Sequence, residues 1–146
     1  MVDSSYKIRD LIGVPYLTGG RDKKGIDCYG LFIEVMKRNG IVVPDLTEIV
    51  SVCDNTVGRS EIIRNQIDEY WEKIDVPEEG CAVAIAMDYE NPDVVQHLGV
   101  YLGKKTIIHV FRKMGIILST IDDPMIKNRI RGYYKWKGSI NEQVKL

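Results

Sequence analysis

The sequence has no apolar run long enough to cross a membrane, and its amino terminus, MVDSSYKIRD, has neither a basic leader nor an apolar signal segment. Its 20 Lys and Arg residues are interspersed with 21 Asp and Glu residues, for a net charge of −1. Such a balance predicts no nucleic-acid surface and no membrane surface. We therefore expect a chain that is cytoplasmic as synthesised, with neither nucleic acid nor membrane as a partner.

Cysteine and histidine are both scarce. The three cysteines, Cys28, Cys53 and Cys81, lie far apart with no C-x-x-C spacing, and there are only two histidines. An odd number of cysteines without a secretory signal argues against a disulfide framework, and no set of zinc ligands at suitable spacing is evident. We expect free thiols, no metal site and no cofactor.

At 146 residues the chain is predicted to form a single domain, residues 1–146. Apolar spacing predicts helices in its first half, and short apolar runs separated by turns predict an antiparallel meander in its second half. The expected fold class is α+β, with N-terminal helices packed on an antiparallel sheet of about five strands. The expected helices cover about 4–12, 28–38 and 61–73, and the expected strands about 81–87, 96–102, 106–112, 116–121 and 129–136.

The stretch from Val14 to Gly40 delivers Cys28 to the start of an amphipathic helix. Asp27 is placed to cap that helix, and Asn39-Gly40 is a stop signal. A thiol on the first helical turn feels the positive end of the helix dipole, which favours the nucleophilic thiolate. The commoner role for a cysteine on an apolar helix face is that of a small buried hydrophobe, so Cys28 alone predicts no activity.

His97 and His109 lie on two expected strands joined by a turn at 103–105. That turn places the two histidines close to opposite one another, on the same face of the sheet. Taken singly, one is explained as a polar residue at a strand start and the other as a core residue bonded to a carbonyl. Taken together with Cys28, they supply the nucleophile, base and orienting group that covalent acyl transfer requires.

These residues carry a resemblance to a known family. The segments PYLTGG, IDCYGL and HLGVYLG, followed by IIH, resemble the motifs of the NlpC-type papain-like cysteine peptidases of bacterial cell walls. The match runs from about Val14 to His109 and includes Tyr16, Asp27, Cys28 and both histidines. The resemblance implies a papain-like NlpC-type α+β fold. It also implies hydrolysis of peptidoglycan stem peptides, usually at the γ-D-glutamyl link to a diamino acid.

Carried over by position, the resemblance makes Cys28 the nucleophile, His97 the general base and later acid, and His109 the orienting group. Tyr16 would place its hydroxyl near the nucleophile, and the Cys28 backbone N–H would complete the oxyanion hole. Asp27 would meet a substrate's free amino end. Tyr29 stands where the family usually has serine and is expected to border the substrate cleft.

Tyr29 and the closing RGYYKW segment look more like the phage-tail branch of the family than like its secreted wall enzymes. Phage-tail proteins are therefore possible partners beside the peptidoglycan peptide, and the protein would be virion-associated or released to the wall. Two alternatives stay open: a catalytically inactive tail component of the same fold, and an amidase or acyltransferase acting on another substrate.

Overall fold

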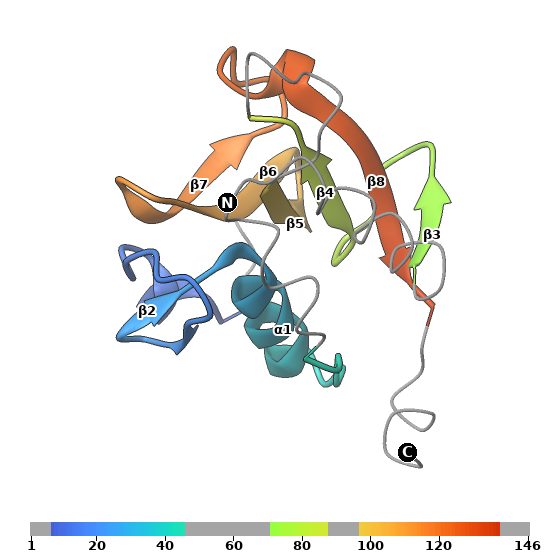
Figure 1. Ribbon diagram of the computed structural model, residues 1–146. Coiled ribbons are helices and arrows are strands. Elements are labelled where there is room, and N and C mark those ends of the chain that lie inside the picture. Colours follow the sequence, from blue (N-terminus) through green and yellow to red (C-terminus); the bar gives the residue numbers. More distant parts are fainter. Residues whose placement is uncertain (1–6, 46–70, 88–96, 138–146) are drawn as a thin grey trace.

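The computed structural model describes residues 7–45, 71–87 and 97–137, and these form an α+β fold (Figure 1). One α-helix, α1 (Cys28–Arg38), packs against a six-stranded antiparallel sheet. A separate two-stranded sheet, β1 (Arg21–Asp22) with β2 (Gly25–Ile26), leads into α1. The fold class is as predicted, with one strand more in the main sheet than the expected number.

The main sheet has the strand order β3-β8-β4-β5-β6-β7. Its strands are β3 (Trp71–Ile74), β4 (Ala82–Ile85), β5 (His97–Gly103), β6 (Thr106–Phe111), β7 (Gly115–Thr120) and β8 (Ile130–Trp136). Short 3-10 helices occur at Arg9–Leu11 and Lys127–Arg129. None of the helices in the described segments has the length and apolar character needed to span a bilayer.

Two helix expectations differ from the structure. Residues 71–73, expected at the end of a helix, belong to strand β3, and the rest of that expected helix lies outside the described residues. The Trp71 ring packs edge-on against Trp136 of β8, with ring centroids 5.0 Å apart, so tertiary packing decides the strand. Within the expected helix at 4–12, the described part contains only the 3-10 turn Arg9–Leu11.

The hairpin between β5 and β6 has the expected register. Val100 pairs with Ile108 and Tyr101 with Ile107. Lys104 and Lys105 at the turn both have positive φ, which is the backbone twist that a tight two-residue hairpin requires. This register fixes where the two histidines stand relative to each other.

The main sheet has a different apolar cluster on each face. Leu98 and Val100 of β5 share one cluster with the apolar residues of α1, including Leu31 and Val35. The alternate residues on β4, β5 and β6 form the other cluster: Val83, Ile85, Tyr101 and Ile107. Because side chains alternate along a strand, each strand contributes to both clusters.

Candidate active site

Cys28 is the first residue of α1, as the sequence predicts. The Asp27 side chain caps the helix by accepting a hydrogen bond from the Gly30 N–H at 2.7 Å, and Asn39 and Gly40 follow its last residue. Cys28 is buried and disulfide-bonded, whereas Cys81 is free. The expectation of free thiols is therefore wrong for Cys28 and correct for Cys81, and Cys53 lies outside the described residues. The Cys28 sulfur therefore has to be reduced before it is a nucleophile.

His97 and His109 are brought together as expected. The Nε2 atom of His97 lies 3.0 Å from Nδ1 of His109, and both side chains are buried. Phe111 packs on both: its ring is stacked on His97, with centroids 5.2 Å apart, and edge-on to His109 at 4.5 Å. The hydrogen bond occupies one nitrogen of the His97 ring, and the Phe111 contact holds the plane of that ring.

Burial decides the charge of this pair. It lowers the pKa of His97 to about 3, with the neighbouring His109 adding to the effect. It also lowers the pKa of His109 to about 4, although the Asp123 carboxylate acts in the opposite direction. Both imidazoles are therefore neutral at neutral pH, so each carries a single N–H.

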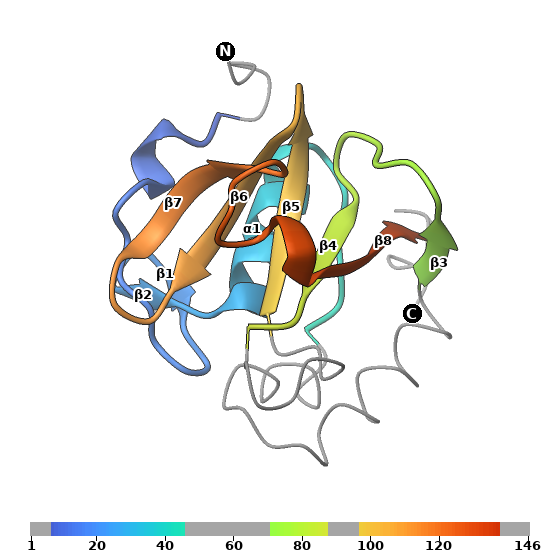
Figure 2. The ribbon, with the colours of Figure 1, turned by 90° about the horizontal axis from the view of Figure 1, so that it is seen from above.

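Cys28 and the histidines belong to opposite faces of the sheet. Ile85 of the second cluster pairs with His97, and Ile107 of that cluster lies two residues before His109, so both imidazoles project on the side away from α1. Cys28 belongs to the cluster on the α1 side. The first turn of α1 and the start of β5 nevertheless lie at the same end of the packed helix and strand (Figure 2).

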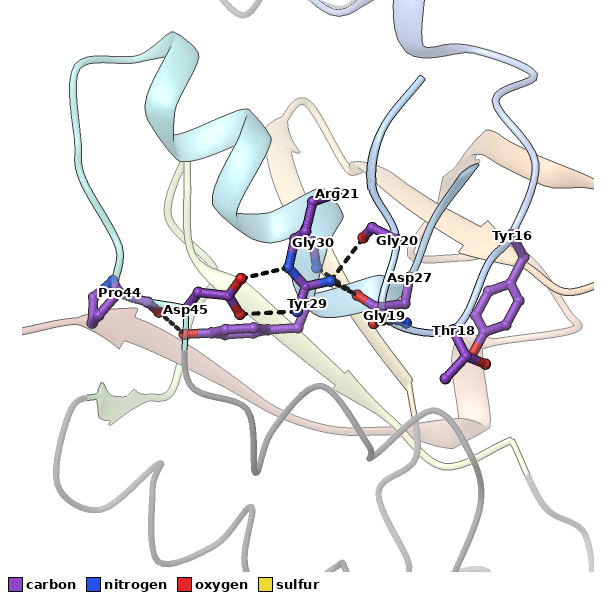
Figure 3. A network of polar contacts seen from close by, with 10 residues as sticks. All are labelled: Tyr16, Thr18, Gly19, Gly20, Arg21, Asp27, Tyr29, Gly30, Pro44 and Asp45. Carbon is purple, nitrogen blue, oxygen red and sulfur yellow. Dashed lines mark hydrogen bonds and ion pairs between the residues drawn. The ribbon is translucent and has the colours of Figure 1, made fainter. Parts of the chain in front are cut away.

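Asp27 lies at the centre of a polar network (Figure 3). Its carboxylate accepts hydrogen bonds from the Gly19 N–H at 2.9 Å, the Gly30 N–H at 2.7 Å and the Arg21 guanidinium at 2.8 Å. Arg21 also binds both carboxylate oxygens of Asp45, at 2.9 and 3.0 Å. The Asp27 side chain is 0% exposed, so its oxygens meet groups of the chain itself, and a role toward a substrate amine stays a prediction.

Tyr29 lies in the core, not at the edge of a cleft where it was expected. The side chain is 0% exposed, and its ring packs on Phe32 and Trp71 with centroid distances of 6.3 Å for each pair. Its hydroxyl donates to the Pro44 carbonyl at 2.7 Å. The residue after the cysteine therefore anchors α1 to the segment that follows the helix.

Tyr16 is half-buried in the loop before β1. A bridge with Ile26 holds the backbone of this loop beside the start of α1. The Tyr16 hydroxyl lies 3.3 Å from the Thr18 hydroxyl. The Arg112 guanidinium lies 4.7 Å from the centre of the Tyr16 ring, a cation–π contact that ties the loop to the residue after Phe111. Tyr16 is thus linked to the strand that carries His109.

Two glycines of the sequence motifs are required by close packing. A Cβ on Gly30 would lie 2.5 Å from the Gly20 carbonyl oxygen, so the loop can lie against the first turn of α1 only with glycine there. A Cβ on Gly99 would lie 2.5 Å from Ile107 of the neighbouring strand and 3.4 Å from the His109 Cβ. Gly99 thus leaves the space that His109 and Ile107 fill.

Sequence reasoning missed four residues around this site: Arg21, Phe111, Arg112 and Ser119. Phe111 and Ser119 have the strand alternation that predicts a shared face with His109, and this signal was available in the sequence. The Ser119 hydroxyl lies 2.7 Å from Nε2 of His109. Arg21 and Arg112 look like ordinary surface charges in the sequence, because their partners come from distant segments.

The arrangement defines a class of protein: a papain-like α+β domain with a cysteine at a helix start and a buried histidine pair on the sheet. The sequence profile of the NlpC/P60 family matches residues 13–135. The chain belongs to this family.

Among the described residues, no group of three or more His, Cys, Asp or Glu side chains is placed to hold a metal ion.

The relatives fit that assignment. The murein DD-endopeptidase MepS/murein LD-carboxypeptidase of Escherichia coli K12 is 25% identical over 121 residues, which are 82% of this chain and 54% of that protein. The chain thus spans about half the length of the curated relatives it matches.

Solved structures share the fold. An NlpC/P60 family protein from Bacillus cereus superposes with a TM-score of 0.61 at 18% identity, covering 88% of this chain and 37% of that one. The NlpC/P60 domain of the peptidoglycan hydrolase SagA superposes with a TM-score of 0.54 at 18% identity, covering 92% of this chain and 98% of that domain.

Proposed function

We propose that this domain is a cysteine peptidase that hydrolyses an amide bond in peptidoglycan stem peptides, the γ-D-glutamyl link to a diamino acid being the expected bond. The observation that carries the proposal is the buried hydrogen-bonded pair of His97 and His109, in a chain whose NlpC/P60 motifs place a cysteine at the start of α1. The murein endopeptidase among its relatives supports peptidoglycan as the substrate class.

In the proposed reaction, His97 takes the thiol proton of reduced Cys28 at Nδ1, the ring nitrogen that does not face His109. The thiolate attacks the amide carbonyl, and His97 then protonates the leaving amine. Water hydrolyses the resulting acyl-enzyme. The Cys28 backbone N–H, one of the first N–H groups of α1, stabilises the oxyanion together with Tyr16.

The test is digestion of purified peptidoglycan by the reduced 146-residue chain, with the released fragments identified by mass spectrometry. We expect the wild type to release peptide fragments, and Cys28→Ala and His97→Ala to release none while keeping the wild-type circular dichroism. Cys81→Ala is the matched control, because Cys81 is a buried free thiol, and it should retain activity. Equal turnover by Cys28→Ala and wild type would exclude the proposed nucleophile.

Two other functions give different results in the same assay. An inactive structural component would leave peptidoglycan intact under reducing conditions, and the disulfide at Cys28 is the observation that favours it. An amidase or acyltransferase would form an acyl-enzyme at Cys28 with another amide or ester and release no stem-peptide fragments. Phage-tail partners gain no support from the relatives described above.

A further inference from the structure

His109 has a hydrogen-bond partner on each side. Its Nδ1 lies 3.0 Å from Nε2 of His97 on β5, and its Nε2 lies 2.7 Å from the Ser119 hydroxyl on β7. The three side chains therefore form a continuous polar chain across the neighbouring strands β5, β6 and β7. His109 itself is completely buried, so both of its ring nitrogens are used inside the protein.

The proton on His109 decides what His97 can do. A neutral imidazole donates at one nitrogen and accepts at the other. If His109 carries its proton on Nε2, it donates to Ser119, its Nδ1 accepts from the Nε2–H of His97, and Nδ1 of His97 is left as a base. If His109 instead carries its proton on Nδ1, this N–H donates to Nε2 of His97. Neutral His97 then holds its own proton on Nδ1 and cannot accept another there.

We propose that Ser119 is a positioning residue: its hydroxyl accepts the Nε2–H of His109 and so holds His97 in the tautomer that accepts a proton at Nδ1. This inference rests on the proposed function, since it assigns His97 as the base. When His97 takes up the Cys28 proton, its Nε2–H still needs an acceptor. Nδ1 of His109 supplies that acceptor only while the proton of His109 is on Nε2.

The strand register keeps Ser119 in this position. Ile107 pairs with Ser119 and His109 with Ile117, so Ser119 lies on the same face as His109 and diagonal to it. Ser119 itself is only partly buried. The Asp123 carboxylate acts to raise the pKa of His109, and His109 acts to lower the pKa of His97. Thr120 follows on the opposite face and gives a matched control.

The kinetic test compares Ser119→Ala, Ser119→Thr and Thr120→Ala, using reduced protein and a stem-peptide muropeptide released from purified peptidoglycan. Ser119→Ala should lower kcat roughly tenfold with KM nearly unchanged, the scale expected for one hydrogen bond. The bell-shaped pH–rate profile of Ser119→Ala should also become narrower. A less stable pair of Cys28 thiolate and His97 imidazolium raises the pKa of the acidic limb and lowers the pKa of the alkaline limb. Ser119→Thr should restore rate and profile, and Thr120→Ala should match the wild type.

A second readout does not depend on turnover. Nitrogen-15 NMR of the histidine rings should show His109 protonated at Nε2 in the wild type and at Nδ1 in Ser119→Ala. An unchanged kcat and pH profile in Ser119→Ala, or His109 protonated at Nδ1 in the wild type, would overturn the role of Ser119. An equal loss in Ser119→Thr and Ser119→Ala would make the effect structural and overturn it as well. Full activity of Cys28→Ala would refute the proposed function instead, and the NMR result would still decide the role of Ser119.

Discussion

The Arg21 guanidinium lies 2.8 Å from the carboxylate of Asp27, the residue directly before the cysteine that starts α1. The Asp27 side chain is fully buried, whereas Arg21 reaches the surface and there meets Asp45. Burial acts to lower the pKa of Arg21, but Asp45 and Asp27 raise it overall, so the guanidinium keeps its charge. A buried anion that caps the helix is therefore neutralised by a cation from β1, and this fixes the loop against the first turn of α1.

Arg21→Ala should destabilise the protein by about 3–5 kcal/mol, because it leaves the Asp27 carboxylate buried without its counter-charge. Asp45→Asn should cost less than about 1 kcal/mol, because that carboxylate is half exposed. Urea unfolding of each variant measures both values. The double variant Arg21→Ala/Asp27→Asn should be more stable than Arg21→Ala alone. If it were less stable, the charge of Asp27 would not be the source of the loss.

Stability should also depend on pH through the two histidines. Their folded pKa values, about 3 for His97 and about 4 for His109, lie below the ordinary value of 6.5. Between these limits the unfolded chain binds more protons than the folded one, so stability is present above pH 6.5 and is lost as the pH falls toward 4 and then 3. Each histidine should account for about 1–2 kcal/mol between pH 6.5 and pH 5.

Urea unfolding of the wild type and of His109→Asn at both pH values isolates this contribution from that of the carboxylates. The asparagine variant keeps a polar side chain but loses the titrating ring, so its loss of stability on acidification should be smaller. Equal losses in the two proteins would mean that His109 does not titrate differently in the folded and unfolded states.

Much of the site could be predicted from sequence because its signals are local. The cap at Asp27, the helix start at Cys28 and the hairpin register that pairs the histidines each depend on residues close in the chain. What could not be predicted depends on distant partners. Tyr29 looked like a cleft residue, but Trp71 and the Pro44 carbonyl hold it in the core. The loop partners of Asp27 come together with it only when the loop folds over α1, so the sequence does not predict them.

The strand at 71–74 shows the same limit. Its residues continue a helical spacing, and only pairing with β8, where Trp71 meets Trp136, makes them a strand. The number and spacing of the cysteines likewise do not predict the disulfide at Cys28.

Cysteine alkylation should separate the chemistry of Cys28 from that of Cys81. Burial raises the pKa of the Cys81 thiol to about 11, so this residue is mostly unreactive at neutral pH. Without reductant, iodoacetamide should label neither residue rapidly, since Cys28 is in a disulfide. After reduction, Cys28 should be labelled much faster than Cys81, because its helix-start position favours thiolate.

Mass spectrometry of the digested protein gives the two labelling rates. Reduced His97→Ala is the informative comparison: if His97 stabilises the thiolate, Cys28 should react more slowly in that variant than in the wild type. Reduced wild-type protein in which Cys28 stays as slow as Cys81 would contradict an activated thiol.

Tyr16 offers a test in which ring and hydroxyl can be separated. The ring packs under Arg112, and the hydroxyl lies near Thr18, so Tyr16→Phe removes only the polar group. If the hydroxyl stabilises the oxyanion, kcat on the stem-peptide substrate should fall by about 10²–10³, the usual loss for one oxyanion donor, with little change in the unfolding midpoint. Thr18→Val removes the neighbouring hydroxyl and should have a much smaller effect. If Tyr16→Phe changed only KM or lowered only the stability, and kcat were preserved, the role of Tyr16 would be limited to shaping the loop through its contact with Arg112.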